Sequence, residues 1–256
     1  MIGILDSGLG GISTLLSLKA LSPDTDIVYL ADQAHAPYGE RNPDELLGYL
    51  EAAIRFFAHK GVEALLLACG TLSAVALPKL KSAPPFPIFS VIEPAAKEAA
   101  RYTKTGVAIL ATTATVQSGV YPKALLSLGV KQTLSAACPL LVPLIENGFL
   151  AESLAAKEIL SHYLAPAKAM GCDTLLLGCT HYGFLSPLFS RLWKEVSVVD
   201  AGKVLAKDAL SKIFPKQGQG KTLFYTTGNP TTFLKKTSTL LSLPHLTVYG
   251  TEGKGI

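Results

Sequence analysis

The sequence contains no apolar run long enough to cross a bilayer. Glycine, proline or a charged residue interrupts every such run within about a dozen residues, whereas a membrane-spanning helix needs about 20. The chain is therefore expected to be soluble, although its mean hydropathy is positive at +0.36. A basic leader is also lacking, and Asp6 stands where the apolar part of a secretory signal would continue, so we expect a cytoplasmic protein.

An excess of one charge sign is lacking too. Lysine and arginine number 23 against 19 acidic residues, and the basic residues are scattered singly. Because no basic stripe could follow a phosphate backbone, neither nucleic acid nor a membrane is expected as a partner. A composition with 49% hydrophobic and 16% charged residues is typical of a packed globular protein, and 256 residues leave room for two domains.

Cysteine is sparse, and Cys69, Cys138, Cys172 and Cys179 are widely separated. In a reducing compartment this spacing favours free thiols over a disulfide framework. No second cluster of cysteine or histidine completes a tetrahedral set with Cys179 and His181, so no metal site is expected.

Short apolar runs alternate with longer helical patterns, which predicts βαβ units and parallel sheets. The predicted strands cover residues 2–5, 27–30, 64–68, 88–92, 107–110, 133–136, 174–177, 196–199 and 223–226. The predicted helices cover residues 13–21, 43–60, 72–80, 95–102, 121–128, 151–170, 185–194 and 203–213.

The chain also repeats itself. Residues 2–7 resemble 107–112, and residues 63–69 resemble 173–179, with each strand of the second pair leading to a cysteine and then a threonine. We therefore expect an α/β fold with two similar doubly wound domains, mainly parallel sheets, pseudo-twofold symmetry and the site in the interdomain cleft, at the strand ends.

The predicted first domain comprises residues 1–94 and 204–256, since the C-terminal segment is too small for a core of its own. The predicted second domain comprises residues 95–203. The break is placed at Glu93-Pro94, because proline disfavours helix at the residue before it.

A glycine-rich segment, Asp6-Ser7-Gly8-Leu9-Gly10-Gly11, follows the first predicted strand and precedes a helix. Such glycines let the backbone approach an anion at a helix N-terminus. The segment does not match the dinucleotide fingerprint, so we expect a small zwitterion whose ammonium faces Asp6. A turn used only for packing is the alternative.

The two cysteines at strand ends, Cys69 and Cys179, are candidate bases. Thr71 and Thr180 follow them and could cap helices, so both thiols are expected near positive helix ends that lower the thiol pKa. Two thiols on opposite sides of one cleft suit removal of a proton from one face of a carbon and its return to the other, which favours epimerisation.

The remaining cysteines, Cys138 and Cys172, occupy apolar contexts in which cysteine behaves as a small hydrophobe. His181 follows Thr180 directly and is the one histidine beside a candidate thiol. A capping or packing histidine is the alternative for His181.

Six motifs in order carry a family resemblance: LDSGLGG at 5–11, DQAHAPYG at 32–39, ACGT at 68–71, VIEP at 91–94, CPLLVPLIE at 138–146 and LGCTHY at 177–182. They resemble those of the bacterial glutamate racemases, in the cofactor-independent aspartate/glutamate racemase superfamily. The resemblance implies two catalytic cysteines, Cys69 for D-glutamate and Cys179 for L-glutamate. Asp6, Glu146 and His181 match residues that assist proton transfer. The implied substrate contacts are Asp6, Ser7, Pro37, Tyr38, Gly39, Gly70, Thr71, Thr115, Thr180 and His181.

The resemblance also implies an isomerase that uses no cofactor, forms a homodimer and supplies D-glutamate for peptidoglycan. The chain departs from the family pattern at Gly70, where asparagine is usual, and at Gly183, where proline is usual. If the asparagine amide contacts substrate, Gly70→Asn should lower the Michaelis constant. Alternatively, Gly70 makes room for a different or larger substrate, or fits a backbone conformation that asparagine would strain. A racemase or isomerase of another dicarboxylate such as aspartate, and a weakened non-catalytic homologue, stay open.

Overall fold

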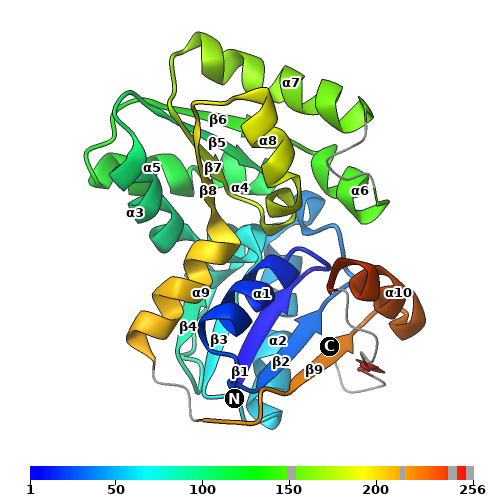
Figure 1. Cartoon of the computed structure of the whole chain (residues 1–256). Coiled ribbons are helices and arrows are strands. Elements are labelled where there is room, and N and C mark those ends of the chain that lie inside the picture. Colours follow the sequence, from blue (N-terminus) through cyan, green and yellow to red (C-terminus); the bar gives the residue numbers. More distant parts are fainter. Residues whose placement is uncertain (149–153, 214–216, 242–246, 252–256) are drawn as a thin grey trace.

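The computed structural model describes residues 1–148, 154–213, 217–241 and 247–251 and shows two α/β domains (Figure 1). Part of the predicted helix 151–170 and the last residues of the predicted first domain lie outside the described residues. The strands are β1 (Ile2–Asp6), β2 (Ile27–Ala31), β3 (Ala64–Leu67), β4 (Ile88–Ser90), β5 (Val107–Ala111), β6 (Thr133–Ala137), β7 (Thr174–Leu177), β8 (Ser197–Asp200), β9 (Thr222–Thr226) and β10 (Val248–Gly250). The nine predicted strands are confirmed, with ends that shift by one or two residues.

The strands form two sheets in which every pair is parallel. One sheet has the order β10-β9-β2-β1-β3-β4, and the other has the order β6-β5-β7-β8. The order β2-β1-β3-β4 is repeated by β6-β5-β7-β8, as the sequence repeat predicts. Strands β9 and β10 extend the first sheet beside β2. The domain boundaries at 94/95 and 203/204 stay predictions.

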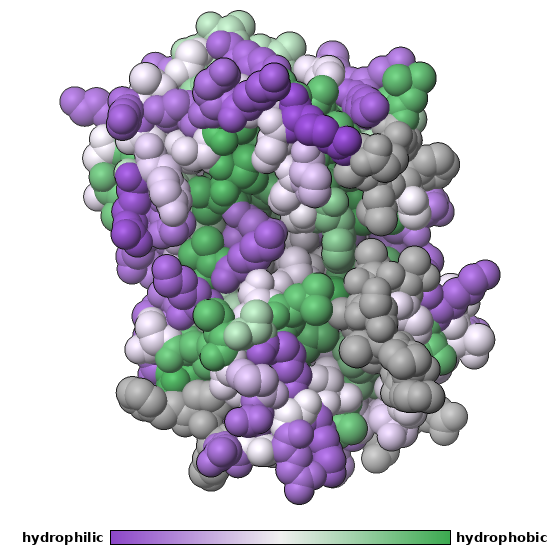
Figure 2. Space-filling view, viewed as in Figure 1, coloured by the Kyte–Doolittle hydropathy of each residue, from purple (hydrophilic) through white to green (hydrophobic). Residues whose placement is uncertain are grey.

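Alternate residues of the strands enter different core layers, because successive side chains of a strand point to opposite faces. Ile2 and Ile4 of β1 lie in the same apolar cluster as Val107 and Ile109 of β5, so one core runs across both domains. Leu5 faces a second cluster under helix α2 (Pro43–His59). Leu110 faces a third cluster under helices α6 (Leu141–Glu146), α7 (Leu154–Ala169) and α8 (Ser186–Leu192). Figure 2 shows hydrophobic side chains near the junction of the domains, whereas the outer end of the second domain is mostly hydrophilic.

The α-helices are α1 (Ile12–Leu21), α2 (Pro43–His59), α3 (Ile92–Tyr102), α4 (Thr113–Ser118), α5 (Val120–Ser127), α6 (Leu141–Glu146), α7 (Leu154–Ala169), α8 (Ser186–Leu192), α9 (Ala201–Lys212) and α10 (Pro230–Leu241). The shorter turns are η1 (Tyr38–Glu40), η2 (Leu72–Ala76), η3 (Leu77–Lys79) and η4 (Thr180–Leu185). Helix α2 begins where predicted, since Asn42 and Glu45 form a capping box and Pro43 occupies the first helical position. No helix within these described ranges is long and apolar enough to cross a membrane.

Two expectations about helices are wrong. The segment 72–80 is not an α-helix but a π-helical turn followed by a 3-10 turn, because Pro78 lacks an N–H and its ring would clash with the carbonyl of Ala74. Helix α3 begins at Ile92, before Glu93-Pro94, since Pro94 lies in the first turn, where an N–H needs no partner within the helix.

Candidate active site

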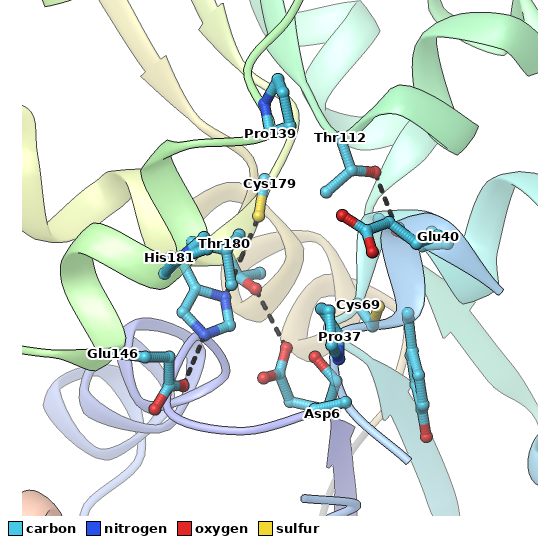
Figure 3. Close-up of a pocket in the computed structure, with 18 of the residues that line it drawn as sticks. Asp6, Pro37, Glu40, Cys69, Thr112, Pro139, Glu146, Cys179, Thr180 and His181 are labelled. Atoms are coloured by element: carbon cyan, nitrogen blue, oxygen red, sulfur yellow. Dashed lines mark hydrogen bonds and ion pairs between the residues drawn. The ribbon is translucent and has the colours of Figure 1, made fainter. Parts of the chain in front are cut away.

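The carboxyl ends of strands from both sheets meet at one cavity of about 380 Å³. Asp6 ends β1, Cys69 lies two residues beyond β3, and Cys179 lies two residues beyond β7. Figure 3 shows Cys179 and Cys69 on different walls, with Thr180 next to Cys179 and Asp6 below both thiols. The cavity thus lies where the strand ends and the repeat predict it.

Most of the site residues expected from the sequence line this cavity: Asp6, Ser7, Pro37, Tyr38, Gly39, Cys69, Gly70, Thr71, Glu146, Cys179, Thr180 and His181. Thr115 does not line it. Its hydroxyl lies 2.9 Å from that of Thr112, which lies 2.9 Å from that of Thr71. Thr115 therefore supports the wall from behind. The roles of all these residues stay predictions.

Several lining residues were not anticipated: Gln33, Ala36, Glu40, Thr112, Thr113, Pro139, Val142, Pro143 and Lys236. Thr112 could have been found, because it takes the place of Ser7 in the sequence repeat. Lys236 carries no local signal, since the C-terminal segment reaches the cavity only through the tertiary fold. Cys138 also lines the cavity while it is fully buried, and Cys172 packs in the same apolar cluster. Both cysteines therefore have the apolar surroundings that the sequence predicts, and their lack of a role in the reaction stays a prediction.

The glycine-rich segment after β1 brings side chains close to the backbone. A Cβ on Gly10 would lie 2.4 Å from Thr180 Oγ1 and 2.5 Å from His181 Nδ1, so only glycine allows this approach. The Asp6 carboxylate accepts hydrogen bonds from the N–H of Gly8 at 2.9 Å and from the hydroxyl of Thr180 at 3.0 Å. Asp6 therefore links the first domain to the turn that carries Cys179.

The anion expected at this segment is supplied in part by the protein itself. The N–H of Leu9 donates to Glu146 Oε1 at 3.2 Å. The tertiary fold thus brings Glu146 from the second domain to this N–H, and binding of a small zwitterion at the rest of the segment stays a prediction.

A chain of polar contacts leads from Cys179 to helix α10. Cys179 Sγ lies 3.9 Å from His181 Nδ1, and His181 Nε2 lies 2.9 Å from Glu146 Oε1. The Lys236 ammonium donates to Glu146 Oε2 at 3.1 Å. These contacts place a basic and an acidic group directly behind one thiol.

The charges of these groups reinforce one another. Burial by itself would lower the pKa of His181, but contacts with Cys179 and Glu146 raise it well above its ordinary value. Burial would raise the pKa of Glu146, but His181, Leu9 and Lys236 lower it to about 2. An imidazolium beside an ionised carboxylate therefore faces Cys179.

Cys69 has a different environment. Burial and the charge of Asp6 raise the pKa of the Cys69 thiol, and the backbone N–H groups of Leu72 and Thr71 offset this only in part. The expected lowering by a helix end is wrong for Cys69, because desolvation outweighs the short turn η2. Neither threonine caps its turn: the hydroxyl of Thr71 faces Thr112, and that of Thr180 donates to Asp6.

Gly70 lies against the opposite domain. A Cβ at this position would be 2.3 Å from the carbonyl oxygen of Gly178, which immediately precedes Cys179. An asparagine side chain would have to displace this backbone, so the approach of Gly178 favours a steric reason for glycine over a missing substrate contact.

The arrangement places two groups that can exchange a proton on one cavity. Two thiols belong to different domains, Asp6 lies near one, and His181 lies near the other. Within the described part of the chain, no three residues of His, Cys, Asp or Glu form a group that could hold a metal ion.

Comparisons with known proteins agree with this geometry. The Asp/Glu/hydantoin racemase family matches residues 15–209. The glutamate racemase of Aquifex aeolicus is 41% identical over 227 residues, which cover 88% of each chain. A glutamate racemase isoform of Bacillus anthracis has a similar structure, with a TM-score of 0.91, 28% identity and coverage of 99% of this chain and 98% of that one. Glutamate racemase of Francisella tularensis in complex with D-glutamate has a TM-score of 0.88, 25% identity and coverage of 98% and 97%.

Proposed function

The chain belongs to the Asp/Glu/hydantoin racemase family, and we propose that it interconverts L- and D-glutamate by proton transfer between two thiols. The observation that carries this proposal is the placement of Cys69 and Cys179, from different domains, on one cavity. The similarity to structures named glutamate racemase, one of them bound to D-glutamate, supports glutamate as the substrate.

In the L-to-D direction, the Cys179 thiolate takes the α-proton and becomes a thiol. The Cys69 thiol gives its proton to the other face of the carbanion and becomes a thiolate. The reverse direction exchanges these roles, so proton and charge balance in each turnover. The assignment of Cys179 to L-glutamate and Cys69 to D-glutamate follows the family resemblance.

The surroundings of the two thiols suit this sequence. The raised pKa of Cys69 keeps it as a thiol that is ready to donate. The positive charge of His181, 3.9 Å from Cys179 Sγ, stabilises the negative charge that Cys179 carries as a base. We propose that Asp6 assists Cys69 and that His181 with Glu146 assists Cys179.

We further propose that the reaction uses no cofactor or metal, that the protein acts in the cytoplasm as a homodimer, and that its D-glutamate enters peptidoglycan. The division into residues 1–94 with 204–256 and residues 95–203 belongs to the same proposal.

Circular dichroism of purified protein with each enantiomer of glutamate and aspartate tests the function. We expect loss of optical activity from both glutamate enantiomers and much slower change with aspartate. Faster racemisation of aspartate would favour the other dicarboxylate function. Binding of glutamate without any change in ellipticity, or without exchange of the α-proton in D₂O, would indicate a non-catalytic homologue.

A further inference from the structure

Lys236 is the most distant member of the contact chain behind Cys179. It lies on α10, which packs against β9 and β10 of the first sheet, whereas Glu146 ends α6 in the second domain (Figure 1). The contact of 3.1 Å between Lys236 Nζ and Glu146 Oε2 therefore crosses from one domain to the other.

Lys236 completes the set of partners around Glu146. Oε1 is already shared by His181 Nε2 at 2.9 Å and the N–H of Leu9 at 3.2 Å, and Lys236 holds Oε2. The Glu146 side chain is 22% exposed and that of Lys236 is 36% exposed, so water screens this ion pair only in part. Without Lys236 the carboxylate could rotate and leave His181.

We propose that Lys236 is a positioning residue that acts through Glu146 and His181 on proton transfer by Cys179. This inference rests on the proposed glutamate racemase function. The ammonium orients Glu146, Glu146 orients His181, and His181 faces Cys179.

The effect should be confined to one of the two proton transfers. Cys69 faces Asp6 and the backbone N–H groups of Thr71 and Leu72, not the chain that ends at Lys236. Loss of Lys236 should therefore raise the barrier for transfer at Cys179 and leave the transfer at Cys69 nearly unchanged.

An alternative role for Lys236 is direct binding of a substrate carboxylate, because its side chain also lines the cavity. That role predicts a raised Michaelis constant with both proton transfers slowed alike or unaffected. Substrate isotope effects separate the two roles, since a deuterium at C2 of each enantiomer reports on the thiol that removes it.

The test compares wild type with Lys236→Met, Lys236→Arg and the control Lys212→Met. Lys212 contacts Asp208 at 2.7 Å on α9 and does not line the cavity. The control variant Lys212→Met therefore also loses a lysine–carboxylate pair, but one outside the cavity. The measurements are kcat and KM in both directions, with ordinary and with 2-deuterio-L- and 2-deuterio-D-glutamate.

For Lys236→Met we expect kcat to fall on the order of fivefold, as for loss of a partly exposed charged pair. The isotope effect with 2-deuterio-L-glutamate should rise, because transfer at Cys179 becomes more limiting, and that with 2-deuterio-D-glutamate should fall. Lys236→Arg should retain most of the activity, because its guanidinium can still donate to Glu146, and Lys212→Met should match wild type.

Wild-type kinetics in Lys236→Met would overturn the role of Lys236 and leave the racemase proposal intact. A raised KM with unchanged isotope effects would assign Lys236 to substrate binding instead. A wild-type protein that does not racemise glutamate would overturn the proposed function, and this inference with it.

Discussion

Substitution of Gly70 should impair racemisation, although the family resemblance predicts that asparagine would improve substrate binding. Gly70 follows Cys69 and faces Gly178, which precedes Cys179. A Cβ at Gly70 would lie 2.3 Å from the carbonyl oxygen of Gly178, more than 1 Å closer than an ordinary van der Waals contact. Any side chain at this position must therefore move one of the two backbones that carry the thiols.

Gly178 has little freedom to retreat. Its N–H donates to the carbonyl of Leu110 at 2.8 Å, and a Cβ on Gly178 would itself lie 2.7 Å from the ring of Tyr121. A side chain at position 70 would thus displace the turn that carries Cys69, or push the two domains apart. A misplacement of about 1 Å at reacting groups can cost about 10²-fold in rate.

The gain in substrate affinity that an asparagine side chain at position 70 could give is smaller than this loss in rate, or comparable to it. A hydrogen bond from an asparagine amide to an ionised substrate contributes about 1.5–3 kcal/mol, or roughly tenfold or more in affinity. Gly70→Ala isolates the steric effect because alanine has no amide. We expect kcat/KM to fall on the order of 10²-fold in Gly70→Ala, with a free energy of unfolding lower by about 1–3 kcal/mol if the domains stay closed.

Steady-state kinetics with both enantiomers of glutamate and denaturant unfolding of Gly70→Ala and Gly70→Asn provide the assay. Gly48→Ala is the matched control, because a Cβ at Gly48 would meet nothing within 4 Å apart from its chain neighbours and the backbone of its own helix α2. Alanine stabilises such a helix position by about 1 kcal/mol relative to glycine. A lower Michaelis constant with undiminished kcat in Gly70→Asn would refute the steric reasoning.

Three further predictions concern the thiols, the cofactor and acid stability. Cys69→Ser and Cys179→Ser should each abolish racemisation, measured by circular dichroism. Cys138→Ser and Cys172→Ser should leave racemisation largely intact. Near-normal turnover in Cys179→Ser would contradict the two-thiol proposal. Racemisation should need no added cofactor and survive chelators and carbonyl reagents, and activity lost to a chelator and restored by one metal would speak against this. The pKa of Glu146 is about 2 in the folded protein against an ordinary 4.5, so its contribution to stability is complete above about pH 4.5 and is lost as the pH falls toward 2. Between about pH 4.5 and pH 2, the free energy of unfolding of wild type should fall by on the order of 2 kcal/mol more than that of Glu146→Gln. An equal loss of stability in both proteins would contradict the lowered pKa of Glu146.

Local sequence was a good guide to the strands and a weaker one to the turns. Strands such as β1 and β5 are apolar throughout because both of their faces are buried, and that pattern needs no knowledge of neighbours. Helices α4 and α6 have only six residues each, too few to show a periodic pattern, and neither was anticipated. Pro78 changes the form of a predicted helix through a clash that the apolar pattern does not record.

The repeat of a strand followed by a cysteine placed Cys69 and Cys179 at the carboxyl ends of parallel strands. The tertiary structure brought these two strand ends, which belong to different sheets, to one cavity. Only the tertiary structure decided what surrounds each thiol. Burial beside Asp6 raises the pKa of Cys69, against the expectation from a helix end. Lys236 reaches Glu146, 90 residues away in the chain, only because the C-terminal segment returns to the first sheet. Desolvation and contacts between distant residues depend on the packed fold, and no local pattern of residues encodes them.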